Sequence, residues 1–120
     1  MTRRTIEQFR AERAAGNERI AACDHLGINR FMRLDAAAYE SAPGGLDGRT
    51  KELLGLTASL VLRCNDCVDY HLEQCVRTGW SRAEIVEAMH VGLVVGGSIV
   101  IPHLRHALAT LDELPIERGD

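Results

Sequence analysis

Apolar residues recur at helical spacing along most of this chain, and no two-residue hairpin turn separates alternating strands. The pattern therefore predicts an all-α protein, a bundle of about six helices joined by loops rich in glycine, proline and polar residues. The segment 91–101 is rich in β-branched residues and glycine, but we expect it to be helical because a lone strand would have no partner. The expected helices cover about residues 5–22, 29–40, 50–62, 64–78, 82–95 and 98–113.

Local signals predict where these helices begin and end. Ser81 and Glu84 form a Ser-x-x-Glu capping box, which is typical of a helix start. Gly16 is a candidate interruption of the first helix, and Gly27 is expected to end that helical region. The apolar residues of the first two helices are expected to face inward: Ile6, Phe9 and Ile20 in the first, and Phe31, Leu34, Ala38 and Tyr39 in the second.

Length and composition restrict the class of protein. A chain of 120 residues is long enough for one hydrophobic core, which predicts a single domain over 1–120. The net charge of -3 does not suit binding to nucleic acid or to an anionic membrane surface. The first residues lack the apolar run of a signal peptide, so we expect a cytoplasmic protein. Gly92 and Gly96 interrupt the longest apolar stretch and would allow close helix packing, either within the chain or between subunits.

The cysteines carry the clearest chemical signal. Because a cytoplasmic protein keeps its thiols reduced, the four cysteines are poor candidates for a structural disulfide framework. Four side chains of redox or metal chemistry lie at helical spacing: Cys64, Cys67, His71 and Cys75. On one α-helix these positions fall within an arc of about 80°, so they would share one face.

This spacing predicts a dithiol redox pair. Cys64 and Cys67 are three residues apart, which allows a disulfide with modest adjustment. His71 lies one turn beyond Cys67, where a neutral imidazole can take the thiol proton and its cation can stabilise the thiolate. A helix that begins near Cys64 would add the positive end of its dipole, and Arg63 would add local positive charge. Asp66, between the two cysteines, opposes these influences.

A structural zinc site is the main alternative. Cys64, Cys67 and His71 would supply three ligands, and the fourth would come from Cys75, His90, His103 or His106. No second Cys-x-x-Cys is present, which favours redox chemistry over zinc. Cys23 and Cys75 fit buried, apolar-like cysteines, and the other histidines, His25 included, are expected singly at surface or hydrogen-bonded core positions.

Glu52 stands twelve residues before Cys64, and the spacing alone leaves its role open. On one unbroken helix Glu52 would lie about 18 Å from the thiols, as a surface carboxylate. A break near Arg63 would let two helices fold back, which would bring Glu52 beside the pair as a proton acceptor or as the group that orients His71.

Several of these segments resemble one known family. The resemblance rests on Thr50-Lys51-Glu52-Leu53-Leu54-Gly55-Leu56, on Cys64-x-x-Cys67-x-x-x-His71, on Gly79-x-Ser81-x-x-Glu84-Ile85-x-Glu87 and on Gly96-Gly97. In this order and spacing the chain resembles the carboxymuconolactone decarboxylase superfamily, and within it the alkylhydroperoxidase D-like branch. The similarity spans about 29–114, which would be the core of the domain, with 1–28 as a helical N-terminal extension.

The resemblance implies a function and a set of site residues. In such proteins a glutamate, two cysteines and a histidine meet in one pocket, which implies that Glu52 and His71 pass protons for Cys64 and Cys67. One thiolate attacks a hydroperoxide and becomes a sulfenic acid, and the other thiol closes a disulfide that a reductant reopens. We assign the attack to Cys67, although the two roles are exchangeable. No cofactor is expected.

Partners and alternatives also follow from the resemblance. It implies a lipoyl- or thioredoxin-like dithiol reductant and a homo-oligomer, a trimer or a hexamer. The chain departs from the best-known peroxidases, because it lacks their additional N-terminal helical half and has Asp66 where a histidine is common. The alternatives are a lyase acting on a small lactone carboxylate in the same pocket and a non-enzymatic metal-binding or oligomeric protein.

Overall fold

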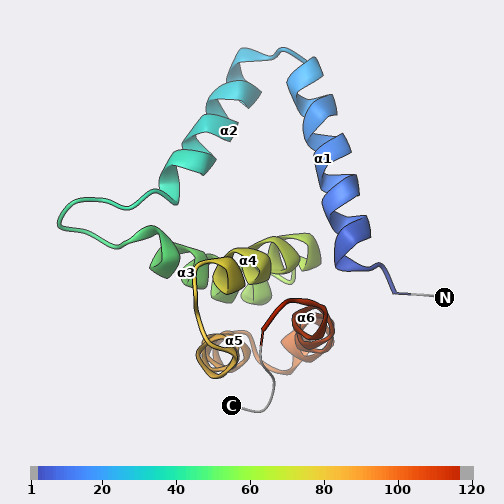
Figure 1. Cartoon of the computed structure of the whole chain (residues 1–120), viewed down its shortest axis with the longest axis vertical. Coiled ribbons are helices and arrows are strands. Elements are labelled where there is room, and N and C mark those ends of the chain that lie inside the picture. The colour runs from blue at the N-terminus through green and yellow to red at the C-terminus, as the bar shows by residue number, and fades with distance from the viewer. Residues whose placement is uncertain (1–2, 117–120) are drawn as a thin grey trace.

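The computed structural model describes residues 3–116, and within this range it contains helices and no strands. The all-α prediction is confirmed. The elements are α1 (Ile6–Ala22), α2 (Leu26–Ala38), α3 (Gly48–Val61), α4 (Asn65–Arg77), α5 (Arg82–Gly96), the short 3-10 helix η1 (Ser98–Val100) and α6 (Ile101–Glu113). Figure 1 shows two parts: α3 to α6 form the body of the molecule, and α1 and α2 form a two-helix arm that stands out from it.

The hydrophobic core lies in the body. There α3 packs against α4 and α5, and α4 also packs against α6. Each of these helices contributes fully buried side chains, among them Leu56, Leu60, Leu72, Met89 and Leu111. Burying a side chain of this size contributes about 1.5–3 kcal/mol, so these contacts are the main source of stability of the body.

The helix starts follow the capping signals. The capping box of Ser81 and Glu84 is present at the start of α5, as the sequence predicts. The segment 91–101 is helical: α5 continues to Gly96, and α6 follows after η1 with Pro102 in its first turn. A Cβ atom added at Gly92 would lie 3.3 Å from the Thr57 carbonyl oxygen, so this glycine serves close packing of α5 on α3 within the chain.

The structure corrects two expectations about the arm. Gly16 does not interrupt α1, which is continuous over Ile6–Ala22. Gly27 does not end the helical region but lies inside α2. The chain turns instead at Asp24, whose φ of 47° is left-handed, and the His25 side chain then caps α2 by accepting a hydrogen bond from the backbone N–H of Ile28.

The apolar stripe predicted for α2 faces solvent in the single chain, with the exception of Tyr39, which is half-buried. Phe31 is 63% exposed and Leu34 is 67% exposed, and α2 buries none of its residues. Amphipathic spacing indicates that one face of a helix is apolar, but it does not indicate what packs against that face. In the single chain the arm stands away from the body, so the body does not cover α2 (Figure 1). In α1, Ile6 and Phe9 are buried as expected, whereas Ile20 is half-buried.

The arm makes the chain more extended than a compact domain. The radius of gyration is 15.1 Å, whereas a compact domain of this length has about 13–14 Å. The N-terminal end of α1 is held to α6 by Glu113. The carboxylate of Glu113 accepts a hydrogen bond from the Ile6 backbone N–H and forms an ion pair with Arg3.

Among the described residues, no helix has both the length and the apolar character needed to cross a bilayer.

Candidate active site

The turn between α3 and α4 resolves the question that Glu52 left open. Leu62 caps the C-terminus of α3, and Arg63 takes a left-handed conformation with φ of 59°. Cys64 then caps the N-terminus of α4. This break reverses the chain, so α3 and α4 lie side by side and the Glu52 side chain contacts His71. The unbroken helix, which would have kept Glu52 about 18 Å from the thiols, does not form.

The two cysteines of the Cys-x-x-Cys segment form a disulfide. Their Cα atoms are 5.3 Å apart, and the Sγ of Cys64 accepts a hydrogen bond from the backbone N–H of Cys67 at 3.3 Å. Cys64 is half-buried, whereas Cys67 is exposed and lines a cavity. Cys64 is the N-cap of α4 and Cys67 lies in its first turn. At this end of the helix, unpaired N–H groups and the helix dipole favour a negative charge on sulfur.

A buried polar chain reaches this cavity from α3. The Nδ1 of His71 and the Oε1 of Glu52 are 2.9 Å apart, and both side chains are buried. When Nδ1 carries the proton, it donates to the carboxylate, and Nε2 presents its lone pair on the other side of the ring. The hydroxyl of Tyr39 lies 3.4 Å from Nε2. The arrangement fixes an imidazole whose second nitrogen, next to the Tyr39 hydroxyl, can accept a proton.

Gly55 makes room for this imidazole. A Cβ atom added there would lie 2.7 Å from Cε1, 2.8 Å from Nε2 and 2.9 Å from Nδ1 of His71, all closer than real contacts. The ring therefore packs directly on the backbone of α3. Gly55 belongs to the segment that carries the family resemblance, but the sequence shows no reason for a glycine there. Tyr39 was likewise expected only as part of an apolar stripe.

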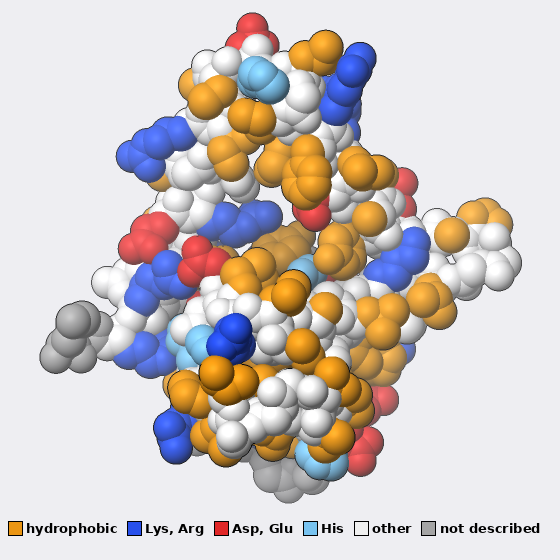
Figure 2. Space-filling view, turned by 180° about the vertical axis from the view of Figure 1, so that it is seen from behind, with side chains coloured by type: hydrophobic (Ala, Val, Ile, Leu, Met, Phe, Trp, Pro, Cys, Tyr) orange, Lys and Arg blue, Asp and Glu red, His pale blue; other side chains and the backbone are white. Residues whose placement is uncertain are grey.

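The cavity has a volume of about 410 Å³ and lies between α1, α2 and α4. In Figure 2 the surface is hollowed between the arm and the body, and hydrophobic side chains gather around the hollow. Cys67 and His71 line it together with the aromatic side chains of Phe9, Tyr39 and Tyr70. Burial, followed by the nearby carboxylates, raises the pKa of both tyrosines, so their hydroxyls stay protonated and remain hydrogen-bond donors at neutral pH.

The other two cysteines lie apart from the site. Cys75 is fully buried in the core, as expected, and burial raises the pKa of its thiol to about 12. It therefore does not share an open face with Cys64 and Cys67. Cys23 was expected to be buried but is exposed, because it caps the end of α1 at the tip of the arm, where nothing in the described chain packs over it.

Two of the three histidines weighed as the fourth zinc ligand, His103 and His106, have other side-chain partners. His103 Nδ1 lies 2.8 Å from the Asn65 side-chain oxygen, and His106 Nε2 lies 2.8 Å from the Asp69 carboxylate. His90 is exposed. Within residues 3–116, no group of three or more histidine, cysteine, aspartate or glutamate side chains is arranged to hold a metal ion. In this part of the chain the geometry therefore brings no set of zinc ligands together at the cysteine pair.

A helical bundle with a dithiol at the first turn of one helix, beside a buried carboxylate and imidazole, defines a class of all-α thiol proteins. The model of the carboxymuconolactone decarboxylase family matches residues 28–112. The chain belongs to this family, and the site is consistent with its alkylhydroperoxidase D-like branch.

Two curated relatives match a large part of the chain. A Paracoccus denitrificans protein called uncharacterized protein 4 in cox locus is 34% identical over 84 residues, which are 70% of this chain and 74% of that protein. An uncharacterized protein of Cupriavidus necator is 30% identical over 87 residues, which are 72% of this chain and 75% of that protein.

Solved structures have the same fold. A crystal structure of a Thermotoga maritima protein is 50% identical, covers 89% of this chain and 92% of its own, and has a TM-score of 0.85. A second T. maritima structure is 51% identical, covers 88% of both chains and has a TM-score of 0.83; it is described as a carboxymuconolactone decarboxylase family protein with a possible involvement in the antioxidative response. A Legionella pneumophila family member is 20% identical with a TM-score of 0.80, covers 90% of this chain and 95% of its own, and supports the fold alone.

Proposed function

We propose that this protein is a thiol-dependent peroxidase, or disulfide reductase, in which Cys64 and Cys67 reduce an organic hydroperoxide. The observation that carries the proposal is the shared cavity. Cys67 and His71 line one cavity, and the other ring nitrogen of His71 is held by buried Glu52. The T. maritima relative supports the proposal, since its description names a possible involvement in the antioxidative response.

The reaction starts at Cys67. His71 Nε2 accepts the thiol proton, while Glu52 stabilises the imidazolium that forms. The thiolate sulfur attacks the terminal oxygen of the hydroperoxide, so an S–O bond forms and the O–O bond breaks. The leaving alkoxide takes a proton from the imidazolium and departs as an alcohol. Cys67 is then a sulfenic acid, oxidised by two electrons.

Cys64 completes the oxidative half of the cycle. Its sulfur attacks the sulfenic sulfur of Cys67, which forms the disulfide and releases hydroxide, and the thiol proton of Cys64 converts that hydroxide to water. An external dithiol, of the lipoyl or thioredoxin type, then returns two electrons and two protons by thiol exchange. The half-buried position of Cys64 and the exposed position of Cys67 support the assignment of Cys67 as the attacking thiol.

Thiol mapping tests the proposal. Reduced protein treated with one equivalent of cumene hydroperoxide is expected to lose two thiols per chain and to form a Cys64–Cys67 disulfide in peptide mass spectra. Cys67→Ser is expected to abolish turnover with dithiothreitol, and Cys64→Ser to stop at a sulfenic acid that dimedone traps. Cys23→Ser is the matched control, because Cys23 is exposed and remote in sequence, and it should retain full activity.

Two outcomes would contradict the proposal. Both thiols remaining intact after peroxide treatment would remove the redox role. Conversion of a small lactone carboxylate by the Cys64→Ser, Cys67→Ser double variant would assign the cavity to lyase chemistry instead.

We also propose that the working form is a homo-oligomer, a trimer or a hexamer. The apolar side chains that α2 exposes support this assembly, since a large apolar face on a single chain is typical of an interaction site.

A further inference from the structure

Asp66 is the residue that works against the proposed chemistry. It stands between the two cysteines, and its carboxylate occupies the first turn of α4, where it competes with a thiolate for the positive end of the helix. Its side chain is 70% exposed, so neither burial nor the core of the protein neutralises it. A negative charge beside Cys67 makes a second negative charge on sulfur less favourable.

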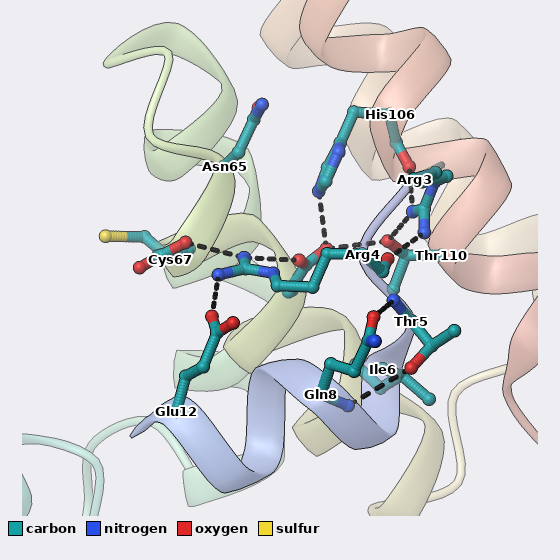
Figure 3. A network of polar contacts seen from close by, with 12 residues as sticks. Arg3, Arg4, Thr5, Ile6, Gln8, Glu12, Asn65, Cys67, His106 and Thr110 are labelled. Carbon is teal, nitrogen blue, oxygen red and sulfur yellow. Dashed lines mark hydrogen bonds and ion pairs between the residues drawn. The ribbon is translucent and has the colours of Figure 1, made fainter. Parts of the chain in front are cut away.

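Arg4, near the N-terminus of the chain, compensates the negative charge of the Asp66 carboxylate. Its Nη2 lies 2.7 Å from the Asp66 Oδ1, although 62 residues separate the two in sequence. Its Nη1 lies 2.8 Å from the Glu12 carboxylate, and Nη2 is also 3.5 Å from the carboxylate of the buried Asp69. Figure 3 shows the Arg4 guanidinium between Glu12 and the first turn of α4, which carries Cys67.

The position of Arg4 is fixed on several sides. Its guanidinium carbon lies 5.0 Å from the centre of the Phe9 ring, and Phe9 is buried. Hydrogen bonds to Asp66 and Glu12 raise the pKa of Arg4, so its guanidinium stays charged across the neutral and alkaline range in which thiols titrate. A pre-positioned cation of this kind loses little side-chain entropy when it pairs, unlike a free surface arginine.

We propose that Arg4 is a positioning residue for the dithiol: it holds Asp66 in an ion pair and so maintains the reactivity of the Cys67 thiolate. The inference rests on the proposed thiol chemistry of the site. It also explains how the chain tolerates aspartate at a position where its resemblance to peroxidases would lead us to expect histidine.

Other charged groups face the same site and must be separated from Arg4. Those near the cavity or the first turn of α4 are Glu12 and Arg13 on α1, Asp35 on α2, Tyr39 at the C-terminal cap of α2, Glu52 on α3, Asp69, Tyr70 and His71 on α4, and His103 on α6 through Asn65. Arg13 stands 4.2 Å over the Tyr70 ring. Among residues 3–116, Arg4 is the one basic side chain recorded in contact with Asp66, so substitution of these two residues isolates their pair.

Alkylation kinetics of the reduced protein test the inference. The rate of iodoacetamide reaction at Cys67, followed by peptide mass spectrometry across pH, reports the thiolate population. Removing Arg4 leaves the exposed Asp66 carboxylate without its ion pair, one residue from Cys67 and in a largely aqueous surrounding, so Arg4→Gln should slow alkylation at neutral pH about threefold. The pH midpoint of alkylation should move upward, and Arg4→Lys should restore most of the rate.

A double-variant cycle separates the ion pair from a structural role. Asp66→Asn should react at least as fast as the parent, and Arg4→Gln should have less than half its effect when Asp66→Asn is present. Arg3→Gln is the matched control, since Arg3 ties the same segment to Glu113 on α6 without contacting Asp66. This control should leave the pH midpoint unchanged.

The inference is overturned if Arg4→Gln leaves the pH midpoint in place, or slows alkylation equally with and without Asp66→Asn. Because alkylation needs no peroxide, the two proposals fail separately. A protein that shows the Arg4–Asp66 coupling but does not consume hydroperoxide would retain this inference and lose the proposed function.

Discussion

At the scale of single residues, the site depends on an imidazole held from two sides. Glu52 binds Nδ1 of His71, and the backbone at Gly55 forms the floor under the ring. A ring fixed in this way needs no reorientation before it accepts a proton, which is the usual requirement for an efficient general base. The smallest change on α3 that tests this arrangement is one methyl group.

Gly55→Ala should therefore impair the site more than the fold. The added Cβ meets three ring atoms of His71 at 2.7–2.9 Å, so the ring must leave the Glu52 carboxylate. We expect peroxide turnover to fall by about tenfold or more, as general base catalysis is lost. Steady-state kinetics and circular dichroism measure both properties. Ala58→Ser, at an exposed position of α3, is the control, and equal turnover in the two variants would contradict the role of Gly55.

Cys75 predicts a dependence of stability on pH. Burial raises the pKa of its thiol to about 12, above its ordinary value of 9.0, so the folded protein holds this proton more tightly than the unfolded chain. The contribution of this thiol to the free energy of unfolding is therefore complete below about pH 9 and is lost as pH rises towards 12. Urea unfolding from pH 7 to 11 should show a steeper loss in the parent than in Cys75→Ala.

The same burial predicts the reactivity of Cys75. In reduced native protein at pH 8, iodoacetamide should modify Cys23, Cys64 and Cys67 and should reach Cys75 only after denaturation. Rapid native modification of Cys75, or parallel pH profiles of the parent and Cys75→Ala, would contradict its burial as a protonated thiol.

At the scale of elements, the turn between α3 and α4 decides whether a site exists. Arg63 holds a φ of 59°, which costs a residue with a Cβ atom about 1 kcal/mol, whereas glycine adopts it freely. The strained turn places Cys64 at the N-cap of α4 and returns the chain along α3. From the sequence, Arg63 was expected as a positive charge beside the thiols and as the place of one possible break between two helices, but its left-handed backbone angle was not predicted.

Arg63→Gly should thus stabilise the protein. We expect the free energy of unfolding to rise by up to about 1 kcal/mol, measured by urea denaturation, with the Cys64–Cys67 disulfide still forming. Asp24→Gly, at the turn between α1 and α2 where φ is 47°, is a parallel test by the same reasoning. Arg63→Val should destabilise the turn, and a loss of stability in Arg63→Gly as large as that in Arg63→Val would show that conformational strain is not what distinguishes this position.

At the scale of the whole molecule, the arm makes the cavity and also exposes an apolar face. One side of the arm closes over Cys67 and His71, and α2 presents Leu26, Phe31 and Leu34 to solvent. A single chain thereby keeps an apolar face uncovered, which is the physical reason to expect association with further copies.

Charge on that face should dissociate the assembly. The parent is expected to have a mass in light scattering of three or six chains, and Phe31→Glu with Leu34→Glu should shift it towards one chain, since a carboxylate is costly to bury. Ala36→Glu is the control and should leave the mass unchanged, because Ala36 is exposed and, at 100° per residue, lies on the side of α2 opposite Phe31 and Leu34. A parent that scatters as a single chain at micromolar concentration would contradict the proposed oligomer.

Much of this protein was predictable from local sequence. The helical periods, the capping box at Ser81 and the Cys64-x-x-Cys67-x-x-x-His71 spacing depend on residues within one or two turns of each other, and α-helix geometry converts such spacing directly into position. The contact of Glu52 with His71 was only one of two alternatives, because a single backbone angle at Arg63 decides between them.

The sequence by itself determined the six helices and the dithiol at the start of one of them, because these depend on hydrogen bonds and side-chain spacing along a single helix. Only the tertiary structure decided that Tyr39 and Gly55 frame the imidazole, that Arg4 pairs with Asp66, and that the apolar side of α2 is left uncovered. Such contacts join residues far apart in the chain, and they depend on which helix faces bury the most apolar surface together, a sum over the whole fold that no short segment contains.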